Sequence, residues 1–152
     1  MSARLCVIEC MGKEPVPNVQ AVTKFVREVI ECNCPDEVFW RIEIQRGSSA
    51  VTACSADCEL RIGGRLLIVV TSESVSRLSP HLAEVIAEGK RARDESKFNR
   101  FRLVVQTGNP DRESDQLFQT FESLSHKDER THLHVLPKDG VPNFFSHAPH
   151  AD

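Results

Sequence analysis

Apolar residues gather along this chain in five short segments, most of them separated by helical patterns. The clearest segment runs from Leu66 to Val70, and its consecutive apolar residues predict a strand covered on both faces. Thr71, Ser72 and Ser74 follow with hydroxyl groups that end the strand and can cap a helix. This order of strand, polar turn and helix predicts an α/β domain.

The other strands are predicted from shorter signals. Residues 4–9, 101–106 and 132–136 carry apolar residues in patterns typical of short strands. Residues 37–45 alternate, which predicts a half-exposed strand near the sheet edge with four apolar residues on one side: Val38, Trp40, Ile42 and Ile44. Many small polar residues interrupt the pattern over residues 47–64, where we favour a short helix.

Apolar residues at spacings of three and four predict helices over residues 19–30, 79–97 and 117–124. Asn18 is a suitable N-cap for the first helix, and Pro35 disfavours helical geometry just beyond its end. The second helix begins with an apolar stripe and continues into a mixed-charge run. We therefore expect its second half to leave the body of the domain and lie in solvent.

Five strands alternating with helices predict a doubly wound, five-stranded parallel sheet, because parallel neighbours need crossover connections. The flavodoxin-like strand order 2-1-3-4-5 fits best. In that order the loop after Glu9 lies close to the turn at Thr71, at the position where such sheets bind ligands. We expect one domain over residues 1–145 and a disordered tail over residues 146–152.

The composition narrows the partners. The chain has 152 residues, which fits one domain, and 19 basic against 22 acidic residues give a net charge of -3. Without a positive excess we expect no nucleic acid, and the partners are proteins or small molecules. The sequence has neither a run of roughly 18 apolar residues nor a basic, then apolar amino terminus. We therefore expect a cytoplasmic protein with no membrane span and no secretory signal.

Cysteine and histidine patterns give little chemistry. The six cysteines lie in close pairs whose spacings match neither zinc knuckles nor redox dithiols, so we expect reduced thiols. His132 and His134 share a strand face, which would suit a metal site, but no carboxylate or cysteine cluster accompanies them in the sequence. We interpret both as residues of an exposed edge strand, and we expect no metal and no cofactor.

Glu84 is the best candidate for chemistry. It lies one turn into the helix after the Leu66–Val70 strand, and a carboxylate there can stabilise an oxocarbenium-like centre, as in glycosidic bond cleavage. Glu88 lies one turn further along the same helix. The alternative interpretation is an ordinary charged helix face, which a single helical glutamate more often belongs to.

The stretch from Val69 to Ser72, with Glu84 and Val85 following it, resembles the Toll/interleukin-1 receptor pattern of a strand ending in serine and a helical glutamate twelve residues later. Pro80 and His81 stand where that family carries a Trp-Cys pair. The resemblance implies, as one alternative, an NAD glycohydrolase with Glu84 as its catalytic carboxylate.

The chain more closely resembles the SEFIR domain of interleukin-17 receptor tails and their cytoplasmic adaptor. The similar segments are an opening strand and helix (4–31), a Phe-Arg-apolar strand with a proline turn (98–110), and a last strand with a closing Pro-x-Phe helix (131–145). The stretch between the second and third strands is shorter than usual in that family, so its second helix is expected to be reduced or missing.

The SEFIR resemblance implies a cytoplasmic signalling module that recruits proteins with SEFIR or Toll/interleukin-1 receptor-like domains, including further copies of itself. Four side chains of the mixed-charge helix would form rim contacts: Glu84, Glu88, Arg91 and Arg93. Such contacts favour the orientation and rate of encounter more than affinity. A third alternative is a flavodoxin-like domain that binds a small ligand at the carboxyl ends of its strands.

Overall fold

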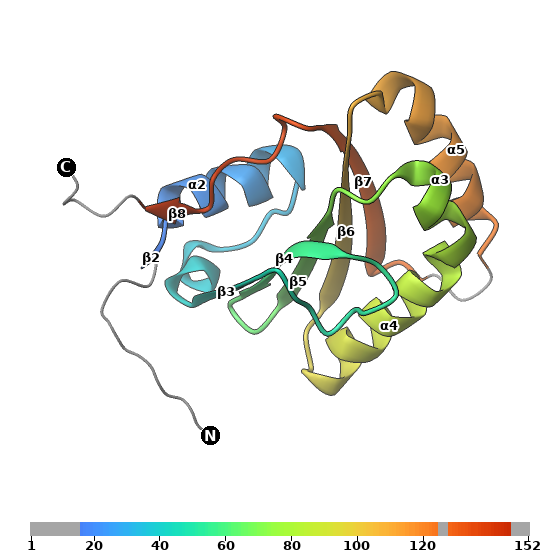
Figure 1. Ribbon diagram of the computed structural model, residues 1–152. Coiled ribbons are helices and arrows are strands. Elements are labelled where there is room, and N and C mark those ends of the chain that lie inside the picture. Colours follow the sequence, from blue (N-terminus) through green and yellow to red (C-terminus); the bar gives the residue numbers. More distant parts are fainter. Residues whose placement is uncertain (1–15, 125–127, 147–152) are drawn as a thin grey trace.

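The computed structural model describes residues 16–124 and 128–146, which form an α/β domain around a mixed five-stranded sheet (Figure 1). In order across the sheet the strands are β3 (Ile42–Arg46), β4 (Ala56–Ile62), β5 (Leu66–Thr71), β6 (Arg100–Thr107) and β7 (Thr131–Pro137). β3, β4 and β5 pair antiparallel, whereas β5, β6 and β7 pair parallel. A separate small sheet pairs β2 (Val16–Pro17) with β8 (Phe145–Ser146).

Helices cover both faces of the five-stranded sheet. On one face, α2 (Val19–Lys24) continues into a π-helical turn, η1 (Phe25–Val29). On the other face lie α3 (Val75–Leu78), the 3-10 turn η3 (Ser79–His81), α4 (Leu82–Glu95) and α5 (Pro110–Glu122). A further 3-10 turn, η2 (Asp36–Trp40), precedes β3. The domain therefore has three layers, with the sheet in the middle (Figure 1).

Two hydrophobic clusters hold these layers together. On the face of α4 and α5 the buried residues include Leu67, Val69, Leu82, Ile86, Leu103 and Leu117. On the face of α2 the buried residues include Val22, Phe25, Val26, Leu60, Ile68 and Val70. Successive residues of β5 thus enter opposite clusters, which explains why this strand is apolar throughout and confirms the prediction that it is covered on both faces.

The sheet is mixed rather than fully parallel, and the described strands do not follow the predicted order 2-1-3-4-5. The cause is a tight turn from Ile62 to Arg65, closed by the Arg65 N–H, which donates to the Ile62 carbonyl at 3.0 Å. Its central residues Gly63 and Gly64 have φ values of 63° and 64°, as in the primed turns of hairpins. Such a turn can join only antiparallel neighbours. The predicted strand over residues 4–9 lies outside the described residues.

Residues 47–64 form a loop and strand β4, and the predicted short helix is wrong. The loop from Gly47 to Ser55 has its backbone N–H groups bound by carboxylates of other elements. These bonds are Ala50 to Glu59 (2.9 Å), Thr52 and Ala53 to Glu88 (2.6 and 2.9 Å), and Ser55 to Glu73 (2.8 Å). Because side chains satisfy these donors, the loop does not need helical hydrogen bonds.

The first predicted helix is confirmed, and Asn18 caps it by accepting a hydrogen bond from the Ala21 N–H at 3.1 Å. The predicted strand over residues 37–45 is divided into η2 and β3. β3 lies at the sheet edge with one face exposed, as predicted. However, Trp40 is 84% exposed and Phe39 is buried, because the 3-10 turn reverses the alternation expected of a strand.

The second half of α4 does not leave the body of the domain. Gly89, Ala92 and Arg93 are all buried there. A Cβ atom added at Gly89 would overlap the ring of Phe101 on β6, so the glycine lets α4 approach the sheet. The prediction that the mixed-charge run lies in solvent is therefore wrong. Two small residues, Gly89 and Ala92, and the internally paired Arg93 place this part of α4 against the sheet.

The closing segment of the chain is not the expected helix. Phe144 is buried, with its ring edge-on to Phe25 at 5.2 Å between centroids, and Phe145 belongs to β8. Ser146, where the disordered tail was predicted to begin, pairs with Val16, and residues 147–152 lie outside the described residues. In the part of the chain that the structure describes, no helix has the length and apolar character needed to cross a membrane.

Candidate interaction surface

Glu84 and Arg91 lie exposed on α4, as the sequence predicted. The Glu84 side chain is 70% exposed, and its Oε1 lies 3.2 Å from Nδ1 of His81. Seven residues are two helical turns, so the two charged groups lie on the same face about 10 Å apart along the axis. Partly exposed Ala87 lies between them. The helix thus presents a carboxylate near one end, a guanidinium near the other, and a small residue at the centre.

Glu88 is bound to the loop between β3 and β4 rather than standing free. Its carboxylate accepts hydrogen bonds from the backbone N–H groups of Thr52 and Ala53 and from the Thr52 hydroxyl. Although burial acts against ionisation, these bonds lower the pKa of the Glu88 carboxyl below its ordinary value. Glu88 therefore holds that loop against α4, and the loop becomes part of the surface beside Glu84 and Arg91.

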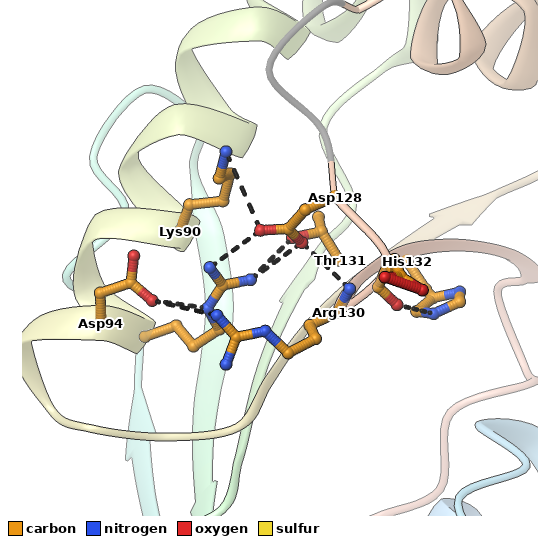
Figure 2. Close-up of polar contacts among 8 residues, drawn as sticks. Lys90, Asp94, Asp128, Arg130, Thr131 and His132 are labelled. Atoms are coloured by element: carbon orange, nitrogen blue, oxygen red, sulfur yellow. Dashed lines mark hydrogen bonds and ion pairs between the residues drawn. The ribbon is translucent and has the colours of Figure 1, made fainter.

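Arg93 was predicted as a rim contact, but its residue is only 1% exposed. Its Nη1 and Nη2 donate to the two carboxylate oxygens of Asp128 at 3.1 and 3.0 Å, a two-pronged pairing. Its Nη1 also donates to the Thr131 hydroxyl at 3.1 Å, and its Nε donates to Asp94 at 2.9 Å. Figure 2 shows Asp128 beside Lys90 of α4 and Thr131 of β7. The guanidinium thus connects α4 with the start of β7, and it faces the protein interior.

The electrostatics of this cluster favour both charged forms. Hydrogen bonds from Arg93, then from Thr131 and the Arg130 N–H, hold the pKa of the Asp128 carboxyl well below its usual range, against the effect of burial. Burial alone would lower the pKa of Arg93, but Asp128 and Asp94 raise it. Arg93 is therefore a structural residue. Of the four residues predicted for the surface of α4, Glu84 and Arg91 are exposed, and Glu88 is partly exposed but bound to the loop.

Glu84 lines none of three clefts that lie on the surface of the described residues. One of about 300 Å³ lies over β3 and β4 and is lined by Arg41, Glu43, Arg61, Gly64, Ser96 and Phe98. A second of about 220 Å³ includes Cys32, Cys34, Arg65, Asn99 and Arg100. A third of about 510 Å³ is a shallow hollow beside Phe118 on α5. The Glu84 carboxylate, the candidate for chemistry, thus lies outside these three clefts, and its side chain is largely exposed.

The cysteines follow the prediction only in part. Cys54 and Cys58 are free thiols, and burial raises their pKa to about 11 and about 12, so both stay protonated. Cys32 and Cys34, however, form a disulfide, although reduced thiols were expected. Their Cα atoms lie 5.6 Å apart because the chain turns sharply after η1, where Glu31 has a φ of 61°. Cys6 and Cys10 lie outside the described residues.

A second buried arginine was not singled out from the sequence. Arg102 on β6 is 5% exposed, its Nε has no hydrogen-bond partner, and its Nη1 lies 3.5 Å from Nε2 of His134 on β7. Burial and then the charge of Arg102 lower the pKa of His134 to about 4. His132 and His134 share the face predicted for them, yet in residues 16–124 and 128–146 no group of three or more His, Cys, Asp or Glu side chains is placed to hold a metal ion.

Comparisons with known proteins give no relative from which a role could be transferred. No protein-family model, curated protein or solved structure matches the chain. The function is therefore inferred from the residues of this domain and from the short SEFIR-like motifs.

Proposed function

We propose that this protein is a cytoplasmic signalling module that associates with like domains, in the manner of SEFIR domains. The observation that supports the proposal is the charge pattern on the exposed face of α4. If two copies of α4 pack antiparallel about a twofold axis beside Ala87, Glu84 of each copy meets Arg91 of the other. The pattern is self-complementary, so the same face can serve on both partners.

The energies suit a reversible contact. An exposed ion pair contributes about 0.2–1 kcal/mol, so two symmetric pairs orient the partners but hold them weakly. Signalling assemblies commonly gain strength by linking several such contacts, because each further contact forms at a high effective concentration. We therefore expect an association that depends on salt and on the number of domains brought together.

No observation favours the NAD glycohydrolase alternative. Catalysis by a carboxylate gains most from a water-excluded site, whereas the Glu84 side chain is 70% exposed and lines none of the three clefts described above. Incubation of the protein with NAD should release no nicotinamide. Release that disappears in Glu84→Gln would contradict the interaction proposal.

A charge exchange tests the association. The Arg91→Glu variant opposes two carboxylates at each symmetric contact and should weaken self-association, measured by sedimentation at low salt. The double variant Glu84→Arg/Arg91→Glu restores both pairs with reversed sense and should recover it. Arg112→Glu changes an exposed arginine on α5 by the same charge and serves as the control.

Three results would contradict the proposed surface. They are wild-type protein that stays monomeric at every concentration, Arg91→Glu that behaves like Arg112→Glu, or a double variant no better than the single one. Reversal of the charge at Arg93 is not a fair test, because that side chain is buried and its loss would disturb the fold. In pull-down of a SEFIR protein, Arg91→Glu should likewise reduce capture.

A further inference from the structure

Arg102 differs from the other buried arginine in having no acidic partner among the described residues. Two carboxylates and a hydroxyl satisfy Arg93. Among the described residues, the Arg102 guanidinium has a polar contact only with the imidazole of His134, at 3.5 Å, and its Nε has no hydrogen-bond partner. A buried charge without a counter-charge is costly, and an unpaired donor adds to that cost. The domain thus keeps a buried cation whose charge the described part of the chain does not balance.

The groups around Arg102 are also basic. His132 lies directly across from it in the β6–β7 register, and His134 lies two residues further along the same face of β7. Arg100 lies two residues before Arg102, on the same side of β6. Asp128 does act on His132, but its carboxylate oxygens are already bound by Arg93. No carboxylate among the described residues acts on the pKa of Arg102, which burial and then the charge of Arg100 lower.

These groups lead from solvent to the buried guanidinium. Arg100 and His132 are exposed, His134 is partly buried, and Arg102 is buried. Arg100 and Arg65 also line the cleft of about 220 Å³, together with the polar side chains of Asn33 and Asn99 and the carboxylate of Glu31. Burial and then the charge of Arg102 lower the pKa of both histidines, so the positive charge lies on Arg100 and Arg102, and the neutral imidazoles beside them can still donate hydrogen bonds. Two like charges on one face of a strand favour a bound anion over a cation.

We propose that Arg102, together with Arg100, His132 and His134, binds an oxyanion of the phosphate type. The unpaired Nε and the neighbouring Nη of a guanidinium form a planar pair of donors that matches two oxygens of such an anion. The anion supplies the missing counter-charge and a partner for the free donor. The site lies on the face of the sheet opposite α4, so it is independent of the association proposed above.

The proposal is tested by the stability of the full chain in inorganic phosphate and in sodium chloride of the same ionic strength and pH. If phosphate binds the folded state alone, the folding equilibrium constant rises about 11-fold when phosphate is ten times its Kd. Arg102→Met removes the charge and keeps the length of the side chain. This variant should be more stable than the wild type without phosphate, and it should lose the response to phosphate.

Arg77→Met is the matched control, because Arg77 is exposed on α3 and belongs to the other face of the sheet. It should retain the full phosphate response. A second readout is a nuclear magnetic resonance titration, in which the His134 imidazole signals should shift with phosphate until they saturate. Arg100→Gln should weaken that titration without abolishing it.

Two outcomes would overturn the proposal. One is a wild-type domain that gains no more stability from phosphate than from chloride. The other is an Arg102→Met variant that keeps the response of the wild type. If Arg102→Met does not fold, the double variant Arg100→Gln/His134→Gln decides the question, since both positions are at least partly exposed, and an undiminished phosphate response there would overturn the proposal equally.

Discussion

Replacing Asp128 with asparagine removes one charge from the Arg93 cluster while keeping the size of the side chain. Arg93 would then be buried with only Asp94 as an acidic contact, and Asp94 is 57% exposed. At roughly 4 Å between the centres of charge, a guanidinium and a carboxylate attract each other by about 4 kcal/mol when the effective dielectric constant is near 20. Breaking a buried pair costs about 3–5 kcal/mol. Because Asp128 is itself 33% exposed, we expect a loss near the lower limit, about 3 kcal/mol.

The assay is urea unfolding followed by far-ultraviolet circular dichroism at pH 7, with Asp94→Asn as the control. Asp94 is 57% exposed and pairs with Arg93 and, at 3.9 Å, with Arg130, so its loss should cost only about 1 kcal/mol. Since the pKa of Asp128 is depressed in the folded state, its contribution is complete above the ordinary value of 3.8 and is lost as the pH falls below it. The gap between wild type and Asp128→Asn should therefore narrow in acid. Equal losses in the two variants at pH 7 would refute this account of Arg93.

Three further predictions concern stability. Gly89→Ala gains about 1 kcal/mol of helix propensity, but the new Cβ atom overlaps the buried Phe101 ring at a cost of about 1–3 kcal/mol. The melting temperature should therefore fall, and adding Phe101→Leu to Gly89→Ala should recover part of the decrease. Gly63 and Gly64 both have positive φ, but only at Gly63 would an added Cβ atom also collide with backbone atoms, those of Val38. Gly63→Ala should therefore lower the free energy of unfolding in urea more than Gly64→Ala does, and equal decreases would contradict the steric argument. The pKa of His134 is depressed from 6.5 to about 4, so stability is complete above pH 6.5 and declines below it, by up to about 2 kcal/mol between pH 7 and pH 5. His134→Gln should flatten that decline, and an unchanged pH profile would contradict the assignment.

The half of the fold that consists of β5, β6, β7 and their connecting helices was predictable, because β5 and β6 carry apolar runs, β7 carries a short strand pattern, and the helices have a clear helical period. The antiparallel pairing of β3, β4 and β5 was not predicted, although the sequence contains a pattern that indicates it. Cys58, Leu60 and Ile62 alternate directly before Gly63 and Gly64, which is a typical hairpin pattern. The loop before β4 could not be read locally, since the carboxylates that hold it belong to other elements.

The interaction surface was predictable only as far as helix periodicity reaches. Glu84 and Arg91 lie outward as expected, but the burial of Arg93 depends on Asp128, which is 35 residues away in sequence. No spacing rule on α4 reveals such a partner. Arg102 shows the same limit, because a single arginine within an apolar strand pattern gives no sign of whether a counter-charge will reach it.

The disulfide between Cys32 and Cys34 encloses a ring of very few residues. Such a small ring restricts the unfolded chain little, and loop-closure entropy gives it only about 1.5 kcal/mol of stabilisation. Reduction of the Cys32–Cys34 disulfide should therefore leave the three-layer fold intact. The same polypeptide can keep its shape in a glutathione-rich environment and in an oxidising one, so the redox state of its surroundings does not decide whether it folds.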